Sequence, residues 1–220
     1  MTDLADLLDQ VGRDQPLPAD SGVSLLPVPA GTAVAAVLGF TAHHVIAADA
    51  DQEWLTSQLD GYEMTRPLEP AFLAALGEHL HARPGGQDNL LVARGNGRQT
   101  STSEVAVADD PAALNHSRVD RALRYREDVS VATVPGGLVT TGRGLAGRWE
   151  ISIEVEESRR GVGIGRKLAE YGRTLVPVDA VLWAQVHPSN VASMRVFLAA
   201  GYRPVGAEVL FTRGSPATPQ

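Results

Sequence analysis

The chain has 220 residues, of which 44% are hydrophobic and 20% charged, a composition typical of a globular α/β protein of one or two domains. It has no cysteine, which excludes disulfides, thiolate catalysis and cysteine-based zinc sites. The formal net charge of −7 is unevenly distributed. Residues 1–100 hold 13 acidic and 5 basic residues (−8), whereas residues 101–220 hold 13 acidic and 14 basic residues (+1).

The N-terminal stretch MTDLADLLDQVG predicts a short helix rather than a secretion signal, because it lacks a basic start and a continuous apolar run. Apolar residues between Leu4 and Val11 repeat at helical spacing, with Thr2 or Asp3 expected as the N-cap. No stretch approaches the roughly 20 apolar residues of a membrane span. We therefore expect a cytoplasmic protein with no membrane partner.

Residues 1–95 are predicted to form an α/β unit that packs on the rest of the chain. The expected elements are two strands within 31–49, a helix over 51–59, a helix from Pro70 to the stop at Pro84, and a strand over 89–93. The Gly-, Ser- and Thr-rich segment 94–104 is the strongest boundary signal in the chain. Its composition predicts a loop there, which is either a domain boundary or the turn of a hairpin.

The second half alternates strands with helices. The expected elements are strands over 104–108, 129–134, 138–141, 148–155, 180–186 and 208–212, and helices over 111–126, from the glycine-rich loop to about 176, and over 190–200. Pro135–Gly137 predicts the turn of a hairpin. The last residues, 214–220, are expected to be disordered.

The stretch ESRRGVGIGRKLAE places three glycines at alternate positions between a predicted strand and a predicted helix. The spacing fits neither a Walker loop nor the dinucleotide fingerprint, and reads instead as R-x-x-G-x-G over Arg160, Gly163 and Gly165. Free N–H groups at a helix start attract phosphate, and missing side chains allow a close approach. The loop is therefore either a diphosphate cradle or a tight turn whose glycines only ease packing.

A second segment, VLWAQVHPSNVASMRVFLAAGY, joins this loop in a pattern that resembles the GNAT superfamily of acyl-CoA-dependent N-acetyltransferases. The matching features are Val155 five residues before Arg160, Asn190 opening a helix, an aromatic residue at Phe197, and the pair Gly201-Tyr202. The resemblance covers about residues 100–213. It implies a mixed, mostly antiparallel sheet splayed between two strands with flanking helices, preceded here by the N-terminal α/β unit.

The resemblance also implies site roles. Acetyl-CoA would be the co-substrate, with its pantetheine arm paired to the backbone between Ile153 and Val155 and near Asn190. The N–H of Val155 would face the thioester oxygen. The full set of cofactor-contacting residues that it implies is Ile153, Val155, Arg160, Gly161, Val162, Gly163, Ile164, Gly165, Arg166, Asn190 and Phe197.

Two positions depart from the family pattern. Many of these enzymes use a Glu as base and a Tyr as acid, but the corresponding positions here read Gln185 and Phe197, which cannot transfer a proton at neutral pH. The remaining candidates for the catalytic role are Glu150 and His187. Each also has a plain structural alternative, a salt bridge to a nearby arginine for Glu150 and an exposed turn for His187.

No metal site is expected, because His43 and His44 point to opposite faces of a strand and His79 and His81 do not share a helix face. The arginines between Arg118 and Arg126 are interrupted by acids, which favours a solvated helix over an anion site. We therefore expect no nucleic-acid partner. The sequence leaves the oligomeric state open, a homodimer included.

Two functions remain open from sequence. One is acetyl-CoA-dependent N-acetylation of a primary amine by direct transfer within a ternary complex. The other is a non-catalytic acyl-CoA-binding or scaffold module, which Gln185 and Phe197 favour. The acidic first half would attract a cationic acceptor, but the sequence does not identify the acceptor.

Overall fold

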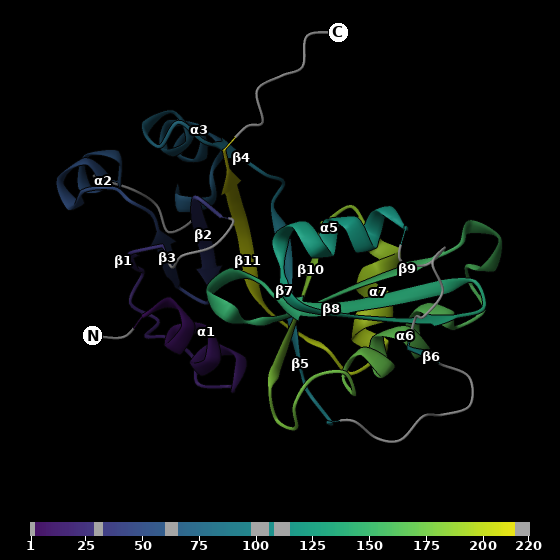
Figure 1. Cartoon of the computed structure of the whole chain (residues 1–220). Helices are drawn as coiled ribbons and strands as arrows, with labels where there is room; N and C mark the ends of the chain where they lie inside the picture. Colours follow the sequence, from purple (N-terminus) through teal and green to yellow (C-terminus); the bar gives the residue numbers. More distant parts are fainter. Residues whose placement is uncertain (1–2, 29–32, 60–65, 98–105, 108–114, 214–220) are drawn as a thin grey trace, which may run out of the picture. The chain divides into compact units, whose positions relative to one another are not determined.

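The computed structural model describes residues 3–28, 33–59, 66–97, 106–107 and 115–213. They fall into two compact units (Figure 1). Unit 1 comprises residues 1–89 together with the C-terminal residues from Val205, and unit 2 comprises Leu90–Pro204. Two strands, β5 (Asp88–Arg94) and β11 (Arg203–Thr212), run through the boundaries between these units.

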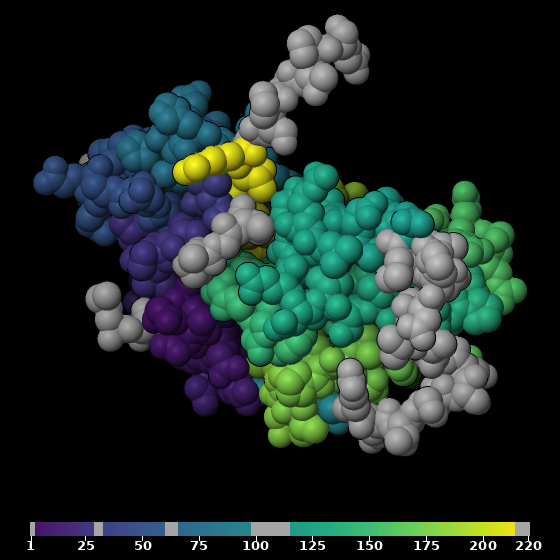
Figure 2. All heavy atoms as spheres, in the orientation of Figure 1, coloured from purple at the N-terminus to yellow at the C-terminus, as the bar shows by residue number. Residues whose placement is uncertain are grey.

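Unit 1 is a small mixed sheet with helices. Its elements are α1 (Leu4–Gly12), β1 (Gly22–Leu26), β2 (Ala35–Phe40), β3 (His43–Ala47), α2 (Gln52–Leu59), the 3-10 turn η1 (Arg66–Leu68), α3 (Pro70–His79) and β4 (Arg83–Pro84). β1 pairs in parallel with β3, β3 pairs antiparallel with β2, and β2 and β4 pair antiparallel with β11. α2 and α3 carry the blue surface of this unit in Figure 2 and bury Leu55, Phe72 and Leu76 against the sheet.

Local sequence signals account for the ends of these helices. The carboxylate of Asp3 accepts a hydrogen bond from the N–H of Asp6, which confirms it as the N-cap of α1. Pro70 begins α3, where its fixed φ and missing N–H are tolerated. The two strands predicted within 31–49 are β2 and β3, and the turn between them lies at Thr41–Ala42.

Unit 2 is the rest of the chain, Leu90–Pro204. Its elements besides the ends of β5 and β11 are β6 (Ala106–Val107), α5 (Ser117–Tyr125), β7 (Glu127–Val134), β8 (Gly137–Arg143), η2 (Leu145–Gly147), β9 (Trp149–Val155), η3 (Glu157–Arg159), α6 (Ile164–Gly172), β10 (Val181–Val186) and α7 (Val191–Ala199). The strand order is β5-β10-β9-β8-β7-β6. β9 and β10 are parallel, and the pairs from β9 through β6 are antiparallel.

The two faces of the β9 strand have different partners. Ile151 points toward α6 and shares a buried core with Leu168 and Ala169. Glu150 and Glu154 point to the other face, where α5 and the residue after it supply arginine partners. Figure 1 shows α5 on one side of this sheet and α6 and α7 on the other. The fold class is therefore the one implied by the resemblance, a mixed, mostly antiparallel sheet with flanking helices.

The observed boundaries differ from the predicted ones in a few places. The predicted division into 1–95 and 100–213 does not coincide with the two units, because β11 pairs along β2 and so places the chain from Val205 in unit 1. β1 and β4 were not predicted, and α6 ends at Gly172 instead of about 176. The predicted tail 214–220 and the first part of the helix predicted over 111–126 lie outside the described residues.

Candidate functional site

The site begins where β9 and β10 part. Their parallel pairing runs from Trp149 opposite Leu182 to Ile151 opposite Ala184. Both strands continue, β9 to Val155 and β10 to Val186, but the pairing does not follow them within the described residues. The backbone of Ile153–Val155 therefore faces an opening on this side of the strand, which is the splay that the sequence resemblance implied.

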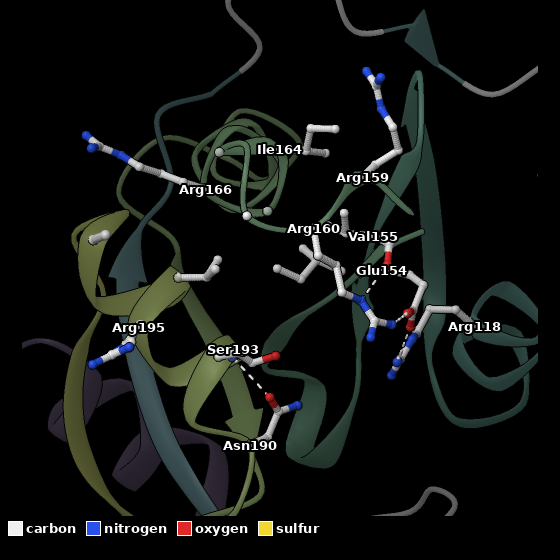
Figure 3. A pocket seen from close by; sticks show the side chains of 17 residues that line it. Arg118, Glu154, Val155, Arg159, Arg160, Ile164, Arg166, Asn190, Ser193 and Arg195 are labelled. Atoms are coloured by element: carbon white, nitrogen blue, oxygen red, sulfur yellow. Dashed lines mark hydrogen bonds and ion pairs between the residues drawn. The ribbon is translucent and has the colours of Figure 1, made fainter. Parts of the chain in front are cut away.

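A pocket of about 500 Å³ occupies this region. Its walls come from the end of β9, the glycine loop, the first turn of α6 and the first turns of α7 (Figure 3). Arg118 of α5 closes another side. The lining residues are Arg118, Ile153, Glu154, Val155, Arg159, Arg160, Gly161, Gly163, Ile164, Gly165, Arg166, Asn190, Ala192, Ser193, Arg195, Val196 and Ala199.

The glycine loop has the backbone that such a wall needs. Gly161 and Gly163 have φ values of 83° and 89°, a region that side-chain-bearing residues rarely adopt, and a Cβ on either would meet no protein atom within 4 Å. Gly163 is the N-cap of α6, and its carbonyl accepts the N–H of Lys167. The N–H groups of the first turn of α6 are left without partners inside the helix, as at every helix start. The loop therefore presents donors to an anion in the pocket.

Charged side chains cluster at one side of the pocket. Glu154 accepts a 2.6 Å hydrogen bond from Arg118 and lies 3.7 Å from the Arg160 guanidinium, which also donates to the carbonyl of Val155 at 3.2 Å. Figure 3 shows Arg118 and Arg160 converging on Glu154, while Arg166 points away from it. Arg166 is itself paired with Glu170 one turn along α6. The described lining includes five arginines and one glutamate, so its side chains carry more positive than negative charge.

Most of the cofactor-contacting residues implied by the resemblance line this one pocket. Asn190 lines it and also caps α7, accepting the N–H of Ser193 at 3.0 Å. Val162 does not line it: the residue is 69% exposed. Phe197 does not line it either, because it lies on the inner face of α7, is 3% exposed, and packs edge-on against Tyr202. Sequence reasoning missed Arg118 and Arg195, since nothing local shows that separate helices reach the same pocket.

Glu150 lies in a buried cluster on the α5 side of the sheet. Its carboxylate accepts hydrogen bonds from Arg126 at 3.0 Å, Arg148 at 2.9 Å and Gln185 at 3.0 Å. Arg148 also lies over the ring of Trp183, 5.1 Å from its centroid. A side chain on Gly144 would overlap the carboxylate, so glycine there leaves room for it. The predicted structural alternative for Glu150, a salt bridge to a nearby arginine, is the arrangement in the structure.

The surroundings of Glu150 decide its protonation. Burial alone would raise the pKa of this carboxyl, but the positive charges of Arg148 and Arg126 and their hydrogen bonds lower it below its usual range. Burial lowers the pKa of Arg126, and the Glu150 carboxylate opposes that effect. Glu150 is therefore an ionised carboxylate whose lone pairs are already engaged by donors, which disfavours it as a proton acceptor.

His187 lies just beyond β10 and outside the pocket lining. Its Nδ1 is 2.7 Å from the hydroxyl of Ser189 and accepts the N–H of the same residue at 3.2 Å. The imidazole thus shapes an exposed turn, as the alternative for this residue predicted. Neither Glu150 nor His187 lines the pocket.

Nothing in the described part of the chain suggests a metal or a membrane span. No group of three or more His, Asp or Glu side chains among these residues could hold a metal ion. No described helix is both long and apolar enough to cross a bilayer.

A scan against protein-family models and a search of curated proteins found no match. Among solved structures, the chain resembles a GCN5-related N-acetyltransferase from Kribbella flavida, with 15% identity, coverage of 99% of this chain and 98% of that one, and a TM-score of 0.48. It also resembles a putative GNAT-family acetyltransferase from Novosphingobium aromaticivorans (14% identity, 61% and 68% coverage, TM-score 0.42) and a GCN5-related N-acetyltransferase-like protein from Streptococcus suis (11%, 81% and 83%, 0.41).

Proposed function

We propose that the chain is a GNAT-superfamily acetyltransferase that transfers an acetyl group from acetyl-CoA to a primary amine within a ternary complex. The observation that carries the proposal is the pocket at the parting of β9 and β10, whose wall includes a glycine loop that caps α6. A thioester carrier needs an extended backbone for its amide arm and an anion cradle for its diphosphate. The lining of this pocket includes the end of β9, which would serve the amide arm, and the glycine loop, which would serve the diphosphate.

The described residues suit each part of such a carrier. The backbone of Ile153–Val155, unpaired with β10, would bind the pantetheine amides as an added strand. The N–H groups from Gly161 to Arg166 would hold the diphosphate, with Arg160 supplying a full charge. The N–H of Val155 would stabilise the oxyanion that forms when the amine attacks the thioester carbonyl.

Proton transfer is where this chain departs from a two-residue mechanism. Gln185 cannot accept a proton, Phe197 has no hydroxyl, and Glu150 is held as a buried ion pair. The acetyl transfer is therefore proposed to rest on positioning the amine beside the thioester, with the amine arriving in its neutral form. The released thiolate would take its proton from solvent.

Calorimetry with CoA tests the binding half of the proposal. Gly161→Val introduces a branched side chain into the loop at a positive φ, and we expect at least a tenfold loss of CoA affinity. Gly147→Val is the matched control, because Gly147 also has a positive φ (71°), also meets no atom within 4 Å at its Cβ, and lies outside the pocket. Equal affinities for the two variants would overturn the assignment of the loop.

The alternative is a non-catalytic acyl-CoA-binding module, and the observation that favours it is the engagement of Glu150 by Arg126, Arg148 and Gln185. Release of free thiol from acetyl-CoA, measured with a panel of primary amines, separates the two functions. Thiol release that depends on the amine supports the transferase. Tight CoA binding without release for any amine from pH 6 to 10 supports the module.

A further inference from the structure

A chain of hydrogen bonds in unit 1 joins a carboxylate, an imidazole and a hydroxyl in that order. The carboxylate oxygen of Asp20 lies 2.8 Å from Nδ1 of His43, and Nε2 of the same ring lies 3.0 Å from the hydroxyl of Ser24. All three residues belong to unit 1, and none of them lines the pocket described above. Nothing in the proposed acetyl transfer uses them.

The pairing of β1 with β3 brings Ser24 and His43 close together. β1 and β3 are parallel neighbours with Gly22 opposite His43 and Ser24 opposite Val45, so Ser24 and His43 project from the same face. Asp20 reaches the ring across a turn, where its carboxylate also accepts the N–H of Gly22 at 2.7 Å. A Cβ on Gly22 would lie 2.7 Å from that same oxygen, so glycine leaves the space that the carboxylate fills.

The order of the partners sets the direction of the hydrogen bonds. The hydrogen bond from His43 holds the pKa of Asp20 below its usual range, so the carboxylate is ionised and can only accept. Nδ1 of His43 therefore carries a proton, which in the neutral ring leaves the lone pair on Nε2. The Ser24 hydroxyl then donates to Nε2. This polarity is the one that lets an imidazole remove a proton from a serine.

The three hydrogen-bonded side chains are buried to different degrees, in a way that suits a reactive serine. The His43 side chain is 9% exposed, whereas the Asp20 side chain is 54% exposed and Ser24 is partly exposed. The base is thus shielded from water while the hydroxyl stays within reach of a small molecule. Among the described strands, β1 is the edge strand of its sheet. Alternate N–H groups of β1 therefore point away from β3 and could donate to a developing oxyanion.

We propose that Ser24, His43 and Asp20 form a second catalytic centre, a serine nucleophile with its base and orienting acid, that hydrolyses small carboxylic esters. The Ser24 oxygen bonds to the ester carbonyl carbon as its proton passes to Nε2 of His43. The carbonyl carbon then loses the alkoxide, which takes that proton and leaves as the alcohol. Water, deprotonated in the same way, releases the acid from the acyl-serine and restores the hydroxyl.

A fluorophosphonate probe tests this directly, because it phosphonylates activated serines and needs no knowledge of the natural ester. The native full-length chain is treated with the probe and digested, and the adduct is located by peptide mass spectrometry. We expect Ser24 to be labelled at least 100-fold faster than Ser57, a serine on α2 whose hydroxyl donates to the carbonyl of Trp54 and accepts from the side chain of Gln58. Hydrolysis of 4-nitrophenyl acetate should fall to the buffer rate in Ser24→Ala and be unchanged in Ser57→Ala.

Substitutions of Asp20 and His43 test whether these residues activate Ser24 or only stabilise the fold. Asp20→Asn keeps the shape of the side chain, and we expect it to slow labelling of Ser24 by 100-fold or more. His43→Gln should abolish labelling, and melting curves of both variants report whether the unit still folds. Absence of a Ser24 adduct on the native chain would overturn the proposal, as would equal labelling in a folded Asp20→Asn variant. Should His43→Gln fail to fold, the native chain and Asp20→Asn still decide the outcome. CoA affinity is measured separately, so this test and that of the acetyltransferase fail independently.

Discussion

The guanidinium of Arg126 and the carboxylate of Glu150 form an ion pair of 3.0 Å with both side chains buried, at 8% and 7% exposure. Arg126 is the C-cap residue that directly follows α5, and Glu150 lies near the start of β9. The pair thus ties the helix to the strand close to where β9 and β10 part. Glu150, a candidate catalytic base from the sequence, thus has a structural role.

Glu150→Gln should strongly destabilise unit 2. The substitution removes the only carboxylate that the described structure places against Arg126 and leaves buried positive charge without compensation, which costs about 3–5 kcal/mol in free energy of unfolding. Urea denaturation measures the loss. The matched control is Glu170→Gln, which breaks an exposed pair with Arg166 and should cost at most about 0.5 kcal/mol. Similar losses in both variants would contradict the role given to the cluster.

Acid should unfold unit 2 partly through the same carboxylate. The folded-state pKa of Glu150 lies below its usual value of 4.5, so the unfolded chain takes up its proton first. The stabilisation is then fully present above pH 4.5 and is lost as the pH falls through the folded-state pKa. Free energies of unfolding measured between pH 7 and pH 3 should fall below pH 4.5, and less steeply in Glu150→Gln. An equally steep fall in that variant would assign the acid sensitivity to other carboxyls.

Phe197→Tyr should lower stability without raising the acetylation rate. Phe197 lies in the core beside Tyr202, so a new hydroxyl would be buried without a prepared partner, at a cost of about 1–3 kcal/mol. Tyr202→Phe is the reciprocal control, because it removes the 3.1 Å hydrogen bond to the carbonyl of Ala169 and should cost about 1 kcal/mol. A tenfold rate gain in Phe197→Tyr would show instead that this position reaches the thioester.

The acetylation rate should rise with pH in step with the ionisation of the acceptor amine. Among the described residues, the one carboxylate that lines the pocket, Glu154, is paired with Arg118 and Arg160. Outside the lining, Glu150 is engaged by arginines and His187 by Ser189, so none of the three is free to accept the amine's proton. Two acceptors with amine pKa values of about 8 and 10 should give profiles displaced by about two pH units. A profile that is the same for both amines and is lost in His187→Ala would restore His187 as a base.

The sequence alone determined the local features of this protein. The alternation of apolar residues located most strands and helices, and Asp3, Pro70 and Gly163 marked helix starts, because capping and turn geometry depend on a few neighbouring residues. The resemblance noted in the sequence implied that the glycine loop and Asn190 contact the same cofactor, and both line one pocket.

Only the tertiary structure decided which partner each polar side chain has. Glu150 meets Arg126 across 24 positions, and Asp20 meets His43 across 23, through contacts between separate elements that no local pattern encodes. Phe197 and Val162 follow the family spacing, yet one lies in the core and the other in solvent, because the packing of α7 and the path of the loop determine which faces reach the pocket. A titratable residue's chemistry depends on burial and neighbouring charge, and both arise only when distant segments pack together.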